Sequence, residues 1–290
     1  MATIIKTFST PNGLYVYDRQ SNSILSVNKE EYKAFTRLEK RLTTRDDESL
    51  LARYKEQGFL QESLLKEIEH PATPSISFQL KKHVKQLTMQ VTQSCNLRCS
   101  YCAYGGNYDN QRTHSKKTMD LDMMRDCVDF LVEHSRGVDE AVIGFYGGEP
   151  FLEIDKIKDC VKYVRETYAR KKISFTATTN GTIINDDIIN FLAGYDFNLL
   201  ISIDGPKHLH NMNRVYDSGG GSYDDIMRNV EYIKLTSPNY FPKVSFATTV
   251  GTNTDFRCIN NFFNATDILR ENTTRYNVLN DALQEASATN

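Results

Sequence analysis

The chain has 290 residues, 40% of them hydrophobic, with a formal net charge of −2 and a pI near 6.3. A chain of this length can bury one large α/β core together with a small second domain. The near-neutral charge gives no electrostatic basis for binding nucleic acid. The N-terminus has no long apolar run or signal-cleavage pattern, and no stretch approaches the length of a membrane span. We therefore expect a cytoplasmic protein that binds neither nucleic acid nor membranes.

Residues 1–69 combine short alternating stretches with amphipathic helical patterns. Between residues 3 and 27, three strand-like stretches are separated by turns rich in Gly and Asn, which predicts an antiparallel meander. Helical spacing of apolar residues follows at 29–42, and a second helix is predicted at about 46–57. We expect a small α+β, winged-helix-like domain here. The segment 70–85 has two prolines near its start, and we interpret it as a linker.

From residue 86 to residue 290, apolar stretches alternate with amphipathic helical patterns. Five strands are readable, at 86–94, 140–146, 173–179, 197–203 and 243–250. Near-continuous apolar strands separated by helices predict an α/β fold with a parallel sheet buried on both faces. Such a sheet either closes into a barrel or stays open as a doubly wound sheet.

Three of the six cysteines fall within eight residues, as Cys95, Cys99 and Cys102. A CxxxCxxC run is compatible with a disulfide, a zinc site or an iron–sulfur cluster. Three thiols are one ligand short of a closed four-cysteine site, and His114 lies in what reads as a loop. A cluster held by three thiolates leaves one iron open to a substrate or cofactor. The spacing therefore favours a chemical role over a structural one.

The other three cysteines, Cys127, Cys160 and Cys258, are isolated within helical patterns. Free cysteine is commonly buried, so we expect these thiols to act as small apolar side chains. Without a disulfide framework, a reducing compartment is the natural setting.

Glycines and polar residues follow the ends of successive predicted strands. They are Gly147, Gly148 and Glu149 after the second strand, Asn180 after the third, and Ser202, Asp204 and Arg214 at or beyond the fourth. Barrel enzymes build their sites at the carboxyl ends of their strands, so this placement favours the barrel. Glycines let backbone approach a ligand, and a carboxylate, amide, hydroxyl or guanidinium can bind a polar ligand. Taken singly, each polar residue also fits a turn or a surface position.

The cysteine run resembles the signature of the radical S-adenosylmethionine (SAM) enzymes, and residues 147–150 resemble their GGEP motif. The resemblance implies a partial (β/α)6 TIM-like barrel in which Cys95, Cys99 and Cys102 hold a [4Fe–4S] cluster and SAM binds its fourth iron. It also implies that the residues at the strand ends contact SAM, namely Gly147, Gly148, Glu149, Asn180, Ser202, Asp204 and Arg214, with the Tyr101 backbone facing adenine. It implies no catalytic residue beyond the cluster and SAM.

Within this superfamily, the chain resembles the SPASM-type peptide maturases. Arg112, His114, Ser115 and Met119 resemble the subgroup that forms thioether links in small peptides. Residues 1–69 resemble a RiPP recognition element, which binds the leader of a ribosomally made precursor peptide as an added strand. The resemblance implies hydrogen abstraction from the precursor by a 5′-deoxyadenosyl radical, with electrons from flavodoxin or ferredoxin.

Other interpretations remain open. Enzymes that mature sulfatases by oxidising Ser or Cys to formylglycine share the core motifs, and a non-catalytic peptide-binding fragment also fits. An alternative for residues 1–69 is a structural cap or a dimerisation module. SPASM enzymes carry a cysteine-rich C-terminal domain, whereas no cysteine follows Cys258. Either the enzyme has lost the auxiliary clusters of that domain or, as we expect, a C-terminal part is missing from this chain.

Overall fold

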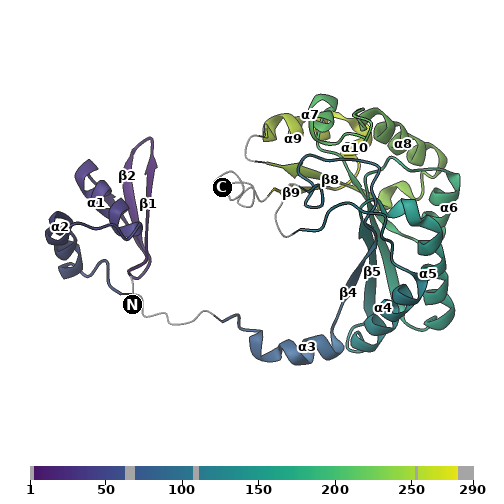
Figure 1. Ribbon diagram of the computed structural model, residues 1–290, viewed down its shortest axis with the longest axis horizontal. Coiled ribbons are helices and arrows are strands. Elements are labelled where there is room, and N and C mark those ends of the chain that lie inside the picture. The colour runs from purple at the N-terminus through teal and green to yellow at the C-terminus, as the bar shows by residue number, and fades with distance from the viewer. Residues whose placement is uncertain (1–2, 63–68, 107–110, 252–253, 280–290) are drawn as a thin grey trace. The chain divides into compact units, whose positions relative to one another are not determined.

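The computed structural model describes residues 3–62, 69–106, 111–251 and 254–279. The chain forms two compact units, Met1–Pro74 and Ser75–Asn290 (Figure 1). The stretch 70–85, expected to be a linker, is not extended throughout, because it contains helix α3 (Ile76–Lys82). The Lys82 carbonyl accepts a hydrogen bond of 2.7 Å from the Gly137 amide, so α3 is joined to the second unit.

The first unit is an antiparallel meander with two helices. Its elements are β1 (Ile5–Thr10), β2 (Gly13–Asp18), β3 (Ser23–Val27), α1 (Lys29–Glu39) and α2 (Arg45–Glu56), and the strand order is β1-β2-β3. Asn28 caps α1, since its side chain accepts hydrogen bonds from the first-turn amides. Val16, Phe35 and Leu60 form the centre of a small core between the sheet and the helices.

The two edges of this meander differ. On β1, the Thr7 amide and hydroxyl both donate to the carboxylate of Glu39 at the end of α1, at 2.9 and 2.6 Å. On β3, no hydrogen bond from another segment of the described residues 3–62 reaches the outer edge. The meander therefore has one edge occupied by a helix side chain and one edge open within its own unit.

The second unit is built on a parallel sheet, which confirms the expected α/β fold. Its described strands are β4 (Gln86–Thr92), β5 (Glu140–Gly147), β6 (Lys172–Thr179), β7 (Asn198–Ser202), β8 (Val244–Val250) and β9 (Thr274–Val278), paired in that order. The helices between them include α4 (Leu121–His134), α5 (Ile154–Thr167), α6 (Asp186–Gly194), α7 (Lys207–Asn213), α8 (Tyr223–Thr236), α9 (Phe256–Ala265) and α10 (Asp267–Arg270). The larger helices cover the outer side of the curved sheet (Figure 1). A stack of Phe145, Phe175 and Phe197 fills the centre of the core.

The sixth strand, β9, corrects the expectation of five. It pairs in parallel with β8 from Phe246↔Thr274 to Val250↔Val278. Its sequence, TRYNV, lacks an apolar run because β9 lies at the edge of the sheet and most of its residues are exposed. None of the helices in the described part of the chain is both long and apolar enough to cross a membrane.

Candidate functional site

The loop that carries the three cysteines is fastened to the end of β5. The Gly148 amide donates to the Thr92 carbonyl at 2.8 Å, and the Glu149 amide donates to the Ser94 carbonyl at 2.9 Å. A Cβ added to Gly148 would lie 2.0 Å from the Ser94 oxygen, and one added to Gly147, whose φ is +147°, would lie 2.4 Å from the Thr92 oxygen. The glycine pair therefore permits close contact with the cysteine loop as well as with any ligand.

The cysteines border a cavity of about 430 Å³ at the carboxyl ends of the strands. Its lining includes Cys95, Cys99, Cys102, Tyr101, Gly147, Gly148, Asn180, Ser202 and Arg214. The structure thus brings together most of the residues that the sequence singled out. A volume of this size suits a small-molecule cofactor.

The thiols fit a cluster better than a single ion. In the described ranges, no group of three or more His, Cys, Asp or Glu side chains converges closely enough to hold one metal ion. A [4Fe–4S] cluster takes one thiolate on each of three irons, so its ligands need not converge on one point. Burial raises the pKa of Cys95, and it raises the pKa of Cys99 to about 11. Iron binding would therefore have to displace protons from these thiols.

Residues that follow the cysteines hold their loop against β4. The Arg112 guanidinium stacks 3.4 Å from the centre of the Tyr104 ring, and its Nε donates to the Gln90 side chain at 3.1 Å. Ser115 Oγ donates to the Gln93 side chain, and the Met119 amide donates to the Val91 carbonyl. Arg112, Ser115 and Met119 therefore stabilise the loop, and these contacts would do so whichever substrate the protein acts on.

The sequence did not predict that His114 lies beside the cysteines, because it reads as a loop residue rather than a ligand. Its Nε2 lies 3.9 Å from Cys102 Sγ, and its Nδ1 lies 3.3 Å from the Gln93 carbonyl oxygen. Burial lowers the pKa of His114. The twelve residues between Cys102 and His114 in the sequence concealed this contact. In the structure the His114 amide donates to the Tyr104 carbonyl at 3.0 Å, which brings His114 close to Cys102.

Glu149 does not line the cavity, contrary to expectation. Its side chain is fully buried, and its carboxylate accepts hydrogen bonds from Thr179 Oγ1 at 2.7 Å, the Asn180 amide at 2.7 Å and the Phe151 amide at 3.1 Å. Burial raises the pKa of Glu149 to about 7, although the three hydrogen bonds oppose that rise. Glu149 therefore joins the ends of β5 and β6.

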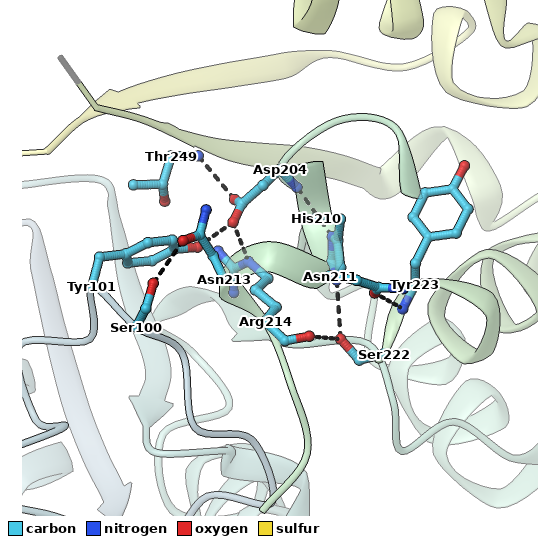
Figure 2. Close-up of polar contacts among 10 residues, drawn as sticks. All are labelled: Ser100, Tyr101, Asp204, His210, Asn211, Asn213, Arg214, Ser222, Tyr223 and Thr249. Carbon is cyan, nitrogen blue, oxygen red and sulfur yellow. Dashed lines mark hydrogen bonds and ion pairs between the residues drawn. The ribbon is translucent and has the colours of Figure 1, made fainter. Parts of the chain in front are cut away.

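Asp204 is also buried behind the cavity wall, where Figure 2 shows it as the centre of a polar network. Its carboxylate accepts from Arg214 Nε at 2.9 Å, from the Thr249 amide at 3.1 Å and from the Tyr101 hydroxyl. Asp204 does not line the cavity, and these three donors occupy its carboxylate, so its contact with SAM stays a prediction. Asp204 orients Arg214, which lines the cavity as Ser202 does, and anchors the side chain of Tyr101.

Behind Asp204, a buried histidine fixes the end of α7 (Figure 2). His210 Nδ1 accepts from the Asp204 amide at 3.3 Å, so its Nε2 carries the hydrogen and donates to Ser222 Oγ at 3.0 Å. Ser222 Oγ in turn donates to the Arg214 carbonyl at 2.9 Å. Burial lowers the pKa of His210 to about 4, so the imidazole is neutral at neutral pH. This chain of contacts holds the backbone that carries Arg214.

The profile of the Radical SAM superfamily matches residues 89–261, which include the cysteine loop and the strand ends described above. This chain belongs to the radical SAM superfamily. Its cofactors are accordingly a [4Fe–4S] cluster and SAM.

Several relatives of this radical SAM chain are known. An uncharacterized protein from Methanocaldococcus jannaschii is 32% identical over 151 residues, 52% of this chain and 49% of that protein. A cysteine-type anaerobic sulfatase-maturating enzyme from Clostridium novyi is 30% identical over 165 residues, 55% of this chain and 42% of that enzyme. The solved structure of native anSMEcpe with bound AdoMet (SAM) has a TM-score of 0.57 and 25% identity, covering 68% of this chain and 52% of that chain. The chain thus spans about half the length of these proteins.

Proposed function

We propose that Cys95, Cys99 and Cys102 hold the [4Fe–4S] cluster and that SAM occupies the adjoining cavity. The observation that carries this assignment is the convergence of the three thiols with polar strand ends on one cavity of suitable size. The carboxylate of Asp204 accepts a hydrogen bond from Arg214 Nε. The terminal N–H groups of the guanidinium can then bind a carboxylate in the cavity, such as that of SAM. When bound, the cluster and SAM supply an organic radical that abstracts hydrogen, while the protein binds, orients and excludes water.

We further propose that the substrate is a cysteine-containing precursor peptide, captured through its leader by the open edge of β3. The Thr7 amide points away from β2, so Thr7 and its partner Val16 form a non-hydrogen-bonded pair of the antiparallel ladder. The backbone N–H and C=O of Val16 therefore point toward β3. Val16 pairs with Leu25, which leaves the backbone groups of Ile24 and Ser26 on the outer edge. A peptide strand would find free donors and acceptors there.

The reaction we propose is thioether formation. A hydrogen atom is removed from a peptide carbon, and a cysteine thiol of the same peptide bonds to that carbon with loss of its proton and one electron. A protein of the flavodoxin or ferredoxin class would supply the reducing electron and accept the one released. The peptide product has lost two hydrogen atoms for each bond formed.

A second candidate is formylglycine formation, which is favoured by the 30% identity with the sulfatase-maturating enzyme from Clostridium novyi. Mass spectrometry of the treated peptide separates the two reactions. Thioether formation removes two hydrogen atoms, whereas conversion of cysteine to formylglycine replaces its thiol by an aldehyde oxygen. An unchanged peptide, despite cleavage of SAM by the enzyme, would count against both.

Leader capture has its own test in Ser26→Pro. Proline removes the outward amide of Ser26 without removing a bond to β2, so precursor binding should weaken at least about tenfold. Ser26→Ala is the matched control, since it keeps the amide. Equal precursor affinity in Ser26→Pro and the wild type would exclude this edge as the docking site.

A further inference from the structure

Both the oxygen and the nitrogen of the Asn180 side-chain amide form hydrogen bonds within the protein. Its Oδ1 accepts hydrogen bonds from the Thr182 amide at 3.0 Å and from Thr182 Oγ1 at 2.7 Å. Its Nδ2 donates to Asn96 Oδ1 at 2.8 Å and reaches Cys95 Sγ at 3.8 Å. An amide has two N–H donors, so these two contacts leave none for a ribose hydroxyl or carboxylate.

The amide is also fixed in place. Asn96 Nδ2 donates to Thr182 Oγ1 at 2.8 Å, which closes a ring of hydrogen bonds around Asn180. Its backbone amide donates to the buried carboxylate of Glu149, and the residue is 7% exposed. Turning Asn180 toward a ligand in the cavity would break several of these bonds at once.

The contact with sulfur has an electrostatic consequence for a bound cluster. Reduction adds negative charge to the cluster and its thiolates, and an N–H group aimed at a thiolate sulfur stabilises that charge. Cys95 Sγ also accepts from the Leu97 amide at 3.4 Å, so this thiol has a backbone donor and a side-chain donor. Removing the side-chain donor should make the cluster harder to reduce.

We propose that Asn180 is a positioning and redox-tuning residue, which donates to the Cys95 thiolate and raises the reduction potential of the cluster. The expectation that Asn180 contacts SAM is replaced by this role. The inference rests on the assignment of Cys95 as a cluster ligand and is independent of the substrate.

The test is a potentiometric titration of the reconstituted full-length chain without SAM, followed by electron paramagnetic resonance. Asn180→Asp keeps the size of the side chain and replaces the donor by a carboxylate oxygen, so its midpoint potential should be more negative than that of the wild type. Asn190→Asp introduces the same charge on the exposed side of α6 and should leave the potential unchanged. An unchanged or more positive potential in Asn180→Asp would overturn the proposal. Weaker SAM binding at an unchanged potential would identify a SAM contact instead.

A second measurement applies if Asn180→Asp fails to hold a cluster. Wild-type protein labelled with asparagine that carries ¹⁵N only in its side-chain amide should show a ¹⁵N hyperfine coupling to the reduced cluster in pulsed electron paramagnetic resonance. Asn96 Nδ2 donates to Thr182 and not to sulfur, so the coupling is expected from Asn180. The absence of any such coupling in a fully loaded wild-type sample would also overturn the proposal.

Discussion

The buried carboxylate of Glu149 sets two physical effects against each other. Three hydrogen bonds favour its charged form, whereas complete burial disfavours it. The balance raises its pKa from 4.5 to about 7, so the folded chain binds a proton that the unfolded chain has released. Stability from this group is therefore fully present below pH 4.5 and is lost as the pH rises through 7.

The size of this effect follows from the shift. At about 1.4 kcal/mol for each pKa unit, the change from 4.5 to about 7 corresponds to about 3.5 kcal/mol over the whole titration. Glu149→Gln does not titrate, so the free energy of unfolding of the wild type should fall by about 2.5 kcal/mol relative to this variant between about pH 5 and about pH 8. Urea unfolding followed by circular dichroism at several pH values measures that difference.

Glu166→Gln, on the exposed side of α5, controls for the loss of one negative charge. If the wild type gains stability relative to Glu149→Gln as the pH rises, the hydrogen bonds outweigh burial. That result would refute the reasoning, because the pKa of Glu149 would then lie below its usual range.

Two further predictions concern the packing around the site. Gly148→Ala places a Cβ 2.0 Å from the Ser94 oxygen, so we expect it to cost about 1–3 kcal/mol of stability and to lower the iron content after reconstitution. Gly194→Ala, with no atom within 4 Å of the added Cβ, is the control, and equal iron content in both variants would contradict the fastening role of Gly148. The pKa of His210 is lowered from 6.5 to about 4. The stability that this group contributes is therefore lost as the pH falls, whereas that from Glu149 is lost as the pH rises. Relative to His210→Gln, the wild type should lose about 2.5 kcal/mol between pH 6.5 and pH 4 in urea unfolding, and a constant difference would show that the imidazole is not held neutral.

The parts of the fold and site that the sequence predicts are those that depend on local pattern. Cys95, Cys99 and Cys102 lie within one short loop, and the alternation of apolar strands with amphipathic helices marks β4 to β8. Because parallel strands end at one edge of a sheet, Ser202 and Arg214 are predicted to meet the cysteines, and both line the cavity. β9 is missed because an edge strand can remain exposed and polar.

The orientation of the polar side chains could not be predicted in the same way. Glu149 receives hydrogen bonds from Thr179 and Asn180, about thirty residues later, and Asp204 receives one from Tyr101, which is 103 residues earlier. Sequence spacing shows that a carboxylate lies near the site but not which donors reach it. A carboxylate that is satisfied inside the protein therefore looks the same in the sequence as one that faces a ligand.

Cys95, Cys99 and Cys102 are proposed to hold a cluster to which SAM binds. The most direct measurement is electron paramagnetic resonance of the anaerobically reconstituted, reduced chain with and without SAM, for the wild type, Cys99→Ala and Cys127→Ala. We predict a [4Fe–4S] signal that SAM alters in the wild type and in Cys127→Ala, because Cys127 lies on α4 and is not among the residues that line the cavity. Cys99→Ala should lack that SAM-dependent signal. A cluster signal in the wild type that is unaffected by SAM, or one that persists unchanged in Cys99→Ala, would contradict the account.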